Sequence, residues 1–293
     1  MQPPKGFEQL DEHGRPKLLK LKKALYGTKQ ASRMWQDKLA EHLTKRMGFK
    51  QSTSDPCMYV KRSKSEVCLV GVYVDDIVLA HNSESMLTWF TEEFTGEKGF
   101  RAKHLGKLSW FLGMAIDQST DYSIKVNQSK FVEKLLDKFA PTYKTSMREH
   151  ASPCNQSTFQ KLRCANDDVE REKVSRLPYR ELVGSLLYLS TMTRPDVSYH
   201  LSVLCQFMHD PSPDCYAAAI DLLLYLGHTK HRGISFNGNT SPPEDLSAHT
   251  GTISNSSGMV AYSDASWHKP NDLGYNMFGY FVFIFGGPVA FSS

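Results

Sequence analysis

A pair of adjacent aspartates, Asp75 and Asp76, stands between two short apolar runs of the sequence. The runs are Val67–Val74 and Ile77–Ala80, both nearly continuous and the first rich in valine. Such runs are typical of β-strands buried on both faces, so we expect the aspartates at the tip of a β-hairpin. Two carboxylates held this close repel each other. A divalent cation would remove that conflict, and carboxylate oxygens are ligands that suit Mg²⁺.

The chemistry available to such a pair is metal-assisted phosphoryl transfer. Two Mg²⁺ ions, or Mn²⁺ in their place, can stabilise the attacking and the leaving oxygen of the reaction. The alternative is an ordinary solvent-exposed Asp-Asp turn that binds nothing, and the dipeptide by itself favours that alternative. The surrounding sequence therefore has to decide between them.

Charge is distributed unevenly along the chain. Residues 1–64 hold 15 Lys and Arg against 6 Asp and Glu, a balance of +9, whereas the remainder holds 20 against 25, a balance of −5. A basic block attached to an acidic remainder suggests that one segment meets a polyanion, although a solvated lysine-rich face explains the charge equally well. If the first interpretation holds, residues 1–64 carry the nucleic-acid affinity, and binding weakens as salt rises.

Composition excludes several classes of protein. A hydrophobic fraction of 40% over 293 residues is enough for a substantial core, so a fully disordered chain is not expected. The six cysteines lack the short spacing of zinc or redox motifs, which predicts reduced thiols. No secretory leader and no apolar run long enough to span a membrane is present. We expect an intracellular protein of the cytoplasm or nucleus that does not contact a membrane.

The elements that would position these residues follow from apolar spacing. Trp35, Leu39, Leu43 and Met47 recur every four positions and predict a helix from Ala31 to Met47. Ser83 or Ser85 is expected to cap the next helix, which Gly96 ends. The remaining expected elements are strands at 108–116, 122–126, 259–262 and 280–285, helices at 128–139, 179–192, 197–209 and 215–227, and polar connecting segments at 141–178 and 235–256. Asp196, beside Pro195 at a helix start, is expected to be structural.

Six stretches of the chain, in order, resemble the reverse transcriptase of Ty1/copia-type retrotransposons. Tyr73-Val74-Asp75-Asp76 resembles the YVDD form of the metal-binding turn of that family. The other matching stretches are Met1–Phe7, Leu21–Trp35, Leu105–Met114, the connecting-region motifs within Tyr179–Asp196, and Tyr262–Ala265, which resembles the first strand of the family's ribonuclease H domain. One such motif would be weak, but six in the right order are specific.

The resemblance implies an α+β fold and a set of site residues. It predicts a partial reverse transcriptase palm, an antiparallel sheet backed by helices, at residues 1–140. A helical connecting region would follow at 141–245, and a partial ribonuclease H-like domain at 246–293. Asp75 and Asp76 would bind the catalytic metals, Tyr73 would lie near the primer end, and Asp264 would belong to the ribonuclease H site. The residues implied to contact nucleotide, primer or template are Lys22, Lys23, Lys29, Gln30 and Arg33.

The implied activity is RNA-directed DNA polymerase with ribonuclease H, acting on an RNA template, a DNA primer and deoxynucleotides beside other parts of a Pol polyprotein. The family places another metal-binding aspartate before the segment that matches Met1–Phe7, and its ribonuclease H site needs more carboxylates than Asp264. We therefore expect a fragment that is inactive alone. The alternatives are a non-catalytic nucleic-acid-binding remnant, a protein domesticated for binding, and a structural relic.

Overall fold

The structure is a computed structural model, which describes residues 1–97, 99–142, 152–154, 156–238, 253–254, 259–265 and 277–293. It has an α+β architecture with three antiparallel four-stranded sheets, ordered β1-β2-β3-β4, β5-β6-β7-β8 and β12-β11-β10-β9. The chain divides into two compact units, Met1–Gly106 and Lys107–Ser293. The three-domain boundaries suggested by the sequence remain a prediction.

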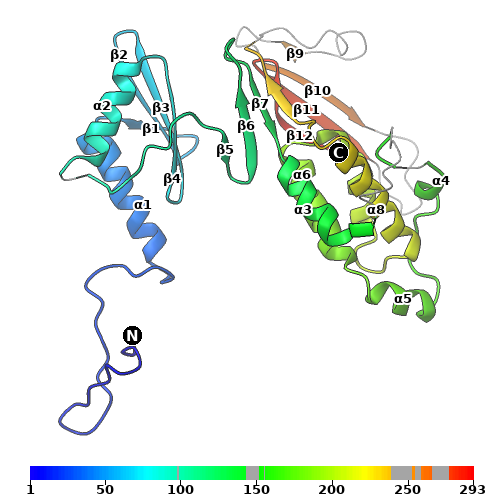
Figure 1. Cartoon of the computed structure of the whole chain (residues 1–293), viewed down its shortest axis with the longest axis horizontal. Helices are drawn as coiled ribbons and strands as arrows, with labels where there is room; N and C mark the ends of the chain where they lie inside the picture. The colour runs from blue at the N-terminus through cyan, green and yellow to red at the C-terminus, as the bar shows by residue number, and fades with distance from the viewer. Residues whose placement is uncertain (98, 143–151, 155, 239–252, 255–258, 266–276) are drawn as a thin grey trace. The chain divides into compact units, whose positions relative to one another are not determined.

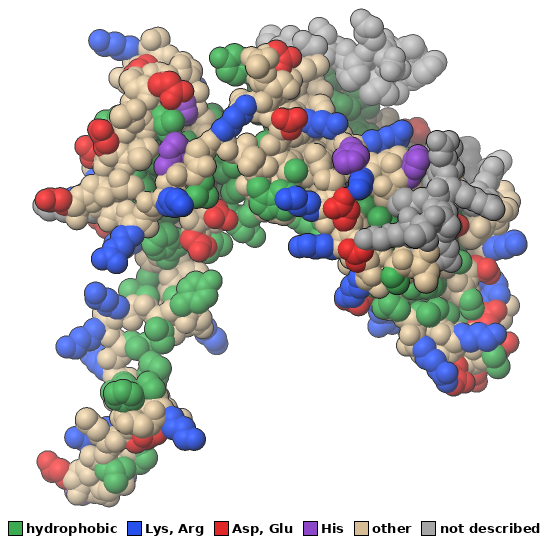
Figure 2. Space-filling model, in the orientation of Figure 1, with side chains coloured by type: hydrophobic (Ala, Val, Ile, Leu, Met, Phe, Trp, Pro, Cys, Tyr) green, Lys and Arg blue, Asp and Glu red, His purple; other side chains and the backbone are tan. Residues whose placement is uncertain are grey.

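The first unit begins with a long segment without a helix or a sheet strand, residues 1–30 (Figure 1). The amino terminus and Leu19 are tied to each other, because the amino terminus donates to the Leu19 carbonyl and the Leu19 amide donates to the Met1 carbonyl. Most side chains of the segment are exposed, and Lys and Arg side chains are spread along it (Figure 2). The segment therefore presents its basic side chains to solvent.

The core of the first unit joins two helices to one face of the first sheet. The helices are α1 (Ala31–Glu41), continued by the π-helical turn η1 (His42–Arg46), and α2 (Glu84–Thr95). The strands are β1 (Lys50–Gln51), β2 (Met58–Ser63), β3 (Glu66–Tyr73) and β4 (Asp76–His81). Leu39 and Leu43 of the expected stripe are at most 2% exposed and pack with Val70 and Phe90. The predicted stripe is thus confirmed, although the helix changes to π geometry after Glu41.

One local expectation in this unit was wrong, and another was confirmed only in part. Strand β3 is buried on one face only, since Cys68 and Val70 are buried while Leu69 between them is 39% exposed. The helices cover only the face of the sheet to which Cys68 and Val70 point. Ser83 is the N-cap residue of α2 and Gly96 ends the helix, as expected, but the Ser83 and Ser85 hydroxyls donate to the Glu66 carboxylate and no side chain caps the helix. These bonds tie the start of α2 to the start of β3.

The second unit contains the helical block and the two remaining sheets. Its helices are α3 (Ser129–Phe139), α4 (Gln156–Phe159), α5 (Asp168–Ser175), α6 (Tyr179–Met192), α7 (Ser198–Gln206) and α8 (Pro213–His228), with the 3-10 turn η3 (Pro195–Val197). Its strands are β5 (Trp110–Phe111), β6 (Met114–Gln118), β7 (Ile124–Asn127), β8 (Ile234–Phe236), β9 (Ile253–Ser254), β10 (Met259–Ala265), β11 (Phe278–Ile284) and β12 (Gly287–Ser292). Helices α3, α6, α7 and α8 share one apolar core, and β8 contacts β12.

Three sequence expectations in the second unit need correction. The strand expected over 108–116 is a hairpin, β5–β6, because Leu112 and Gly113 both adopt positive φ and reverse the chain. The segment 141–178 contains helix α5, whose N-cap Asp167 accepts a hydrogen bond from the Glu170 amide. This cap was readable from the sequence as Asp followed three residues later by Glu. Strand β12 was not expected, while most of 235–256 lies outside the described residues.

An ion pair between a buried arginine and a partly exposed aspartate ties the 3-10 turn η3 to helix α8. The Arg194 guanidinium, 2% exposed, donates to both carboxylate oxygens of Asp196 at 2.9 and 2.7 Å, and also to the Thr229 carbonyl. The Tyr225 hydroxyl donates to Asp196 as well. Burial works against the charge of Asp196, but these hydrogen bonds hold the pKa of its carboxyl below the usual range. Asp196 is therefore structural, as expected.

The hairpin between β3 and β4 turns through two residues, Val74 and Asp75, since Tyr73 pairs with Asp76. Val74 has a φ of 56°, a left-handed conformation that is rare for a β-branched residue. Its side chain is 56% exposed, so little burial offsets this cost. The turn is therefore strained at the residue directly before Asp75.

Substituting Asp196→Asn should destabilise the second unit by about 2–3 kcal/mol, because it leaves a buried guanidinium without its counter-charge. Chemical denaturation followed by circular dichroism measures this loss. The control is Asp168→Asn, whose side chain is 98% exposed beside Arg171 and should change stability by less than about 0.5 kcal/mol. Since the pKa of Asp196 is lowered, its contribution is present above the ordinary Asp pKa and should be lost as pH falls through the folded-state value. Equal effects of the two variants would contradict the assignment.

Substituting Val74→Asn should stabilise the first unit by about 1 kcal/mol, because asparagine adopts left-handed φ at lower cost than valine. The matched control is Val74→Thr, which keeps the β-branch and so should give no gain. Thermal unfolding of the whole chain compares the three proteins. A loss of stability in Val74→Asn would show that the turn is not strained.

Candidate metal-binding turn

The β3–β4 hairpin presents its two carboxylates to solvent at one end of the first sheet. Asp75 occupies the second position of the two-residue turn and Asp76 is the first residue of β4. Both side chains are exposed. The prediction that the pair lies at the tip of a hairpin is confirmed. That the pair shares a cation remains a prediction.

Tyr73 closes the strand that leads into the turn and pairs with Asp76 across the hairpin. Its side chain is 54% exposed, and it lies in the same outward position along β3 as Leu69. The phenol ring is thus open to a ligand on that face. Among the described residues, no group of three or more His, Cys, Asp or Glu side chains is arranged to hold a metal ion. Asp75 and Asp76 fit Mg²⁺ by the chemistry of their oxygens, but alone they do not complete a two-metal site.

A tryptophan on α1 contacts the turn directly. The Trp35 indole Nε1–H donates to the Val74 carbonyl at 2.7 Å. The sequence indicated Trp35 only as one apolar position of a helical stripe, and its role as a donor was missed. The signal available was the indole N–H itself, which usually finds an acceptor when the ring is partly buried.

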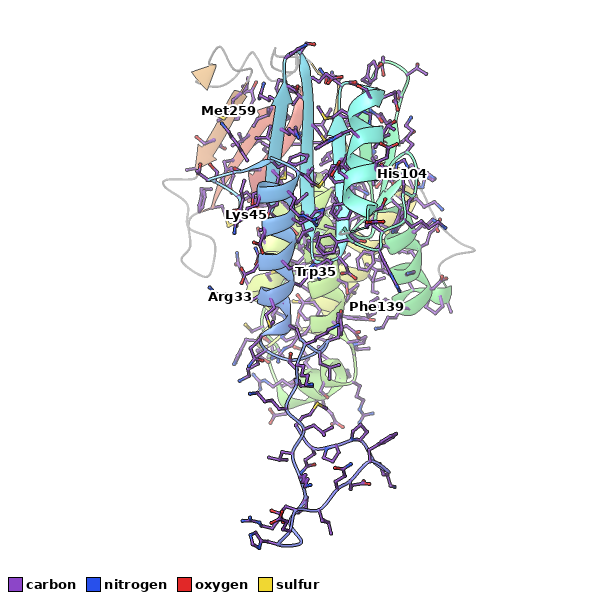
Figure 3. The ribbon with its side chains drawn as sticks, turned by 90° about the vertical axis from the view of Figure 1, so that its left-hand side faces the viewer. Arg33, Trp35, Lys45, His104, Phe139 and Met259 are labelled. Atoms are coloured by element: carbon purple, nitrogen blue, oxygen red, sulfur yellow. The ribbon has the colours of Figure 1, made fainter. Side chains whose placement is uncertain are left out.

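The basic side chains implied by the resemblance lie in the exposed segment before α1 and on its first turn. Gln30 is the N-cap residue of α1 without a side-chain capping bond, and Arg33 is 88% exposed with only a 3.9 Å approach to Asp37. Arg33 and Trp35 project from opposite sides of α1 (Figure 3). Helix α1 therefore carries both the exposed cation Arg33 and the Trp35 indole N–H that donates a hydrogen bond to the turn. The remaining lysines of this set, Lys22, Lys23 and Lys29, are all exposed.

Asp264 lies in the second unit, near the end of β10, where it pairs with Gly279 of β11. Its side chain is exposed. Among the described residues, Asp264 belongs to no group of three or more His, Cys, Asp or Glu side chains that could hold a metal ion. Its part in a ribonuclease H site stays a prediction.

No described helix is both long and apolar enough to cross a membrane. No disulfide joins any of the six cysteines, all of which lie in the described part of the chain, and Cys57 and Cys164 are exposed. The expectation of reduced thiols agrees with this finding.

Comparison with known proteins identifies relatives along the whole chain. The family model described as "Reverse transcriptase (RNA-dependent DNA polymerase)" matches residues 1–151. The Retrovirus-related Pol polyprotein from transposon TNT 1-94 of Nicotiana tabacum is 28% identical over 100% of the chain and 20% of that protein. The corresponding polyprotein from transposon RE1 of Arabidopsis thaliana is 32% identical over 100% of the chain and 18% of that protein.

A shorter relative is the putative transposon Ty5-1 protein of Saccharomyces cerevisiae, 27% identical over 100% of the chain and 85% of that protein. The chain spans about a fifth of the length of the two plant polyproteins. No solved structure matches the chain significantly. The family match covers more than half of the chain, and its relatives are retrotransposon polyproteins. The chain therefore belongs to the reverse transcriptase family of Ty1/copia-type retrotransposon Pol polyproteins.

Proposed function

We propose that this chain carries part of the polymerase site of an RNA-directed DNA polymerase, with Asp75 and Asp76 as metal ligands. The observation that supports the proposal most is the hairpin: of its two exposed carboxylates, Asp75 lies in a strained, hydrogen-bonded turn and Asp76 directly after it, in a chain of the reverse transcriptase family. Strained backbone in proteins is concentrated at functional sites, where the surrounding structure maintains it. The ordinary exposed Asp-Asp turn does not explain why this strain is kept.

The reaction of the family is the attack of a primer 3′-hydroxyl on the α-phosphate of a deoxynucleotide, with release of pyrophosphate. When bound, Mg²⁺ would neutralise phosphate charge beside the attacking and leaving oxygens. Asp75 and Asp76 would hold the ions through their carboxylate oxygens, and the exposed ring of Tyr73 would contact the primer end. The first sheet would serve as the palm, and β10–β12 as the start of a ribonuclease H-like sheet that includes Asp264.

The number of carboxylates limits what the chain can do alone. Two divalent ions at short separation repel each other, so ligands from more than one strand are needed to hold both. Asp75 and Asp76 come from a single hairpin, and no other described acidic residue joins them in a metal-binding group. We therefore propose that the polymerase site is completed by a further aspartate, as in the family, and that this chain alone is inactive.

A second candidate function is nucleic-acid binding without catalysis. The exposed cations at residues 22–33 favour it, because exposed lysines and arginines bind phosphates by releasing condensed counterions and need no metal site. RNA and DNA would be the partners in either case. Deoxynucleotides and the other parts of a Pol polyprotein would be needed only for catalysis.

The purified chain, given Mg²⁺ or Mn²⁺, deoxynucleotides and a DNA-primed RNA template, should show no primer extension. Loss of one metal ligand raises the barrier by several kcal/mol, and about 1.4 kcal/mol is a factor of ten in rate. Gel analysis of labelled primers measures extension. Clear extension that disappears in Asp75→Asn would show that the chain holds a complete site.

Nucleic-acid binding should depend on the cations before and at the start of α1. Replacing four of these cations with glutamine should weaken binding of a short RNA–DNA hybrid duplex. The slope of the logarithm of the binding constant against the logarithm of the salt concentration should fall in size by about 0.9 for each phosphate that is no longer neutralised. Fluorescence anisotropy at several salt concentrations gives both values. The four substitutions are Lys22→Gln, Lys23→Gln, Lys29→Gln and Arg33→Gln.

The matched control makes the same charge change in the second unit, at four exposed lysines. It should leave most of the affinity and slope intact. Point substitutions are needed because deletion of residues 1–64 would also remove α1, β1 and β2 from the first unit. Equal losses of affinity in the two variants would mean that binding depends on the net charge of the chain and not on the cations of this segment. The control substitutions are Lys125→Gln, Lys134→Gln, Lys161→Gln and Lys173→Gln.

A further inference from the structure

Two tight turns of the chain share an unusual arrangement. Val74 and Leu112 are non-glycine residues at positive φ, 56° and 50°, and each lies in a turn that joins two strands. In both cases the carbonyl of the strained residue accepts a hydrogen bond from an aromatic side chain on a helix. Trp35 Nε1 donates to Val74 at 2.7 Å, and the Tyr188 hydroxyl donates to Leu112 at 2.9 Å. An aromatic donor thus holds each turn in its left-handed conformation.

We propose that Trp35 is a positioning residue for the metal-binding turn, which rests on the proposed function of Asp75 and Asp76. The Val74 carbonyl belongs to the same planar peptide unit as the Asp75 amide nitrogen. A hydrogen bond that fixes the direction of this carbonyl therefore also fixes the peptide plane that leads into Asp75. The orientation of that plane limits where the Asp75 carboxylate can lie. Trp35 sets the orientation of the carboxylate without touching the metal.

The donor is itself held firmly. Trp35 lies one helical turn before Leu39, which is 2% exposed, and its ring packs against the core of the first unit. Its ring centroid lies 5.2 Å from that of Phe100 in an edge-to-face arrangement. A side chain fixed by packing orients a functional group more closely than one on a mobile loop. The position of the turn is thereby tied to α1.

The hydrogen bond from Trp35 stabilises the strained conformation of Val74. Without a partner for its carbonyl, the exposed turn would relax toward a conformation with less steric cost. The two carboxylates would then spread over several arrangements, and a cation would have to select one of them. The cost of that selection would appear as weaker metal binding. Trp35 removes the cost by holding the turn before the cation arrives.

Trp35→Phe is the variant that tests the proposal, because it keeps an aromatic ring in the core but removes the indole N–H. We expect Mn²⁺ binding to the whole chain, measured by water-proton relaxation, to weaken by about fivefold, the typical net effect of one hydrogen bond. The control is Trp89→Phe. Trp89 packs in the same core, stacked on Phe49 and beneath the Lys61 ammonium, and belongs to α2 rather than contacting the turn.

The outcomes separate the two proposals. The double variant Asp75→Asn/Asp76→Asn should abolish the Mn²⁺ effect, and if it does not, the proposed metal site itself is wrong. If the double variant abolishes binding but Trp35→Phe binds as the unsubstituted chain does, only the positioning role is wrong. Equal weakening in Trp35→Phe and Trp89→Phe would show an effect of core packing and would also overturn the positioning role.

A second measurement on the unsubstituted chain does not depend on whether a variant folds. In nuclear magnetic resonance spectra of the ¹⁵N-labelled chain, the Trp35 indole N–H should exchange slowly with solvent and should broaden when Mn²⁺ is added. The Trp89 indole serves as the internal comparison and should broaden less. Rapid exchange of the Trp35 indole, or equal broadening of the two, would overturn the proposal.

Discussion

The packing of the α1 stripe against one face of strand β3 is the constraint on which the first unit depends. Leu39 of α1 and Leu43 of η1 belong to one buried apolar cluster with Cys68 and Val70 of β3, and burying these side chains together holds the helix on the sheet. Once α1 is fixed, Trp35 reaches the carbonyl of Val74 at the end of the sheet. The orientation of two exposed aspartates therefore follows from apolar packing well inside the unit.

Polar interactions have a different role in each unit. In the second unit, the buried Arg194 pairs with Asp196, and the pair also bonds to Tyr225 and Thr229, so it joins the turn η3 to the end of helix α8. In the first unit, the single bond from Trp35 holds a conformation that valine disfavours. The first arrangement contributes to the uniqueness of a core. The second keeps an exposed turn in one conformation.

Membership of the reverse transcriptase family changes what these exposed carboxylates mean. In an unrelated protein, two aspartates at a hairpin tip would be a solvated turn. Here they stand in a chain that matches the family model over residues 1–151, and exposed cations lie before and on the first turn of the helix that contacts the turn. A phosphate-rich substrate suits the exposed cations, and a divalent cation suits the carboxylates. The carboxylate count nevertheless argues for a partial site.

The sequence by itself determined the elements whose apolar spacing is regular. The stripe from Trp35 to Met47 and the bounds of α6 followed from local periodicity. The hairpin followed from two apolar runs that flank Asp75 and Asp76. Neither signal depends on the rest of the chain. The Asp167 cap of α5 was also present in the sequence, although it was not used. The family resemblance was likewise carried by contiguous residues and their order.

Tertiary structure decided the features that depend on residues far apart in the chain. Trp35 and Val74 are 39 positions apart, and no local pattern shows that an indole meets that carbonyl. The reversal at Leu112 was hidden because an apolar residue occupies a turn position that usually favours glycine, and Tyr188 stabilises it from 76 positions away. The expectation that β3 is buried on both faces was wrong for the same reason. Burial is set by what packs against a strand, and the strand's own residues do not contain that information.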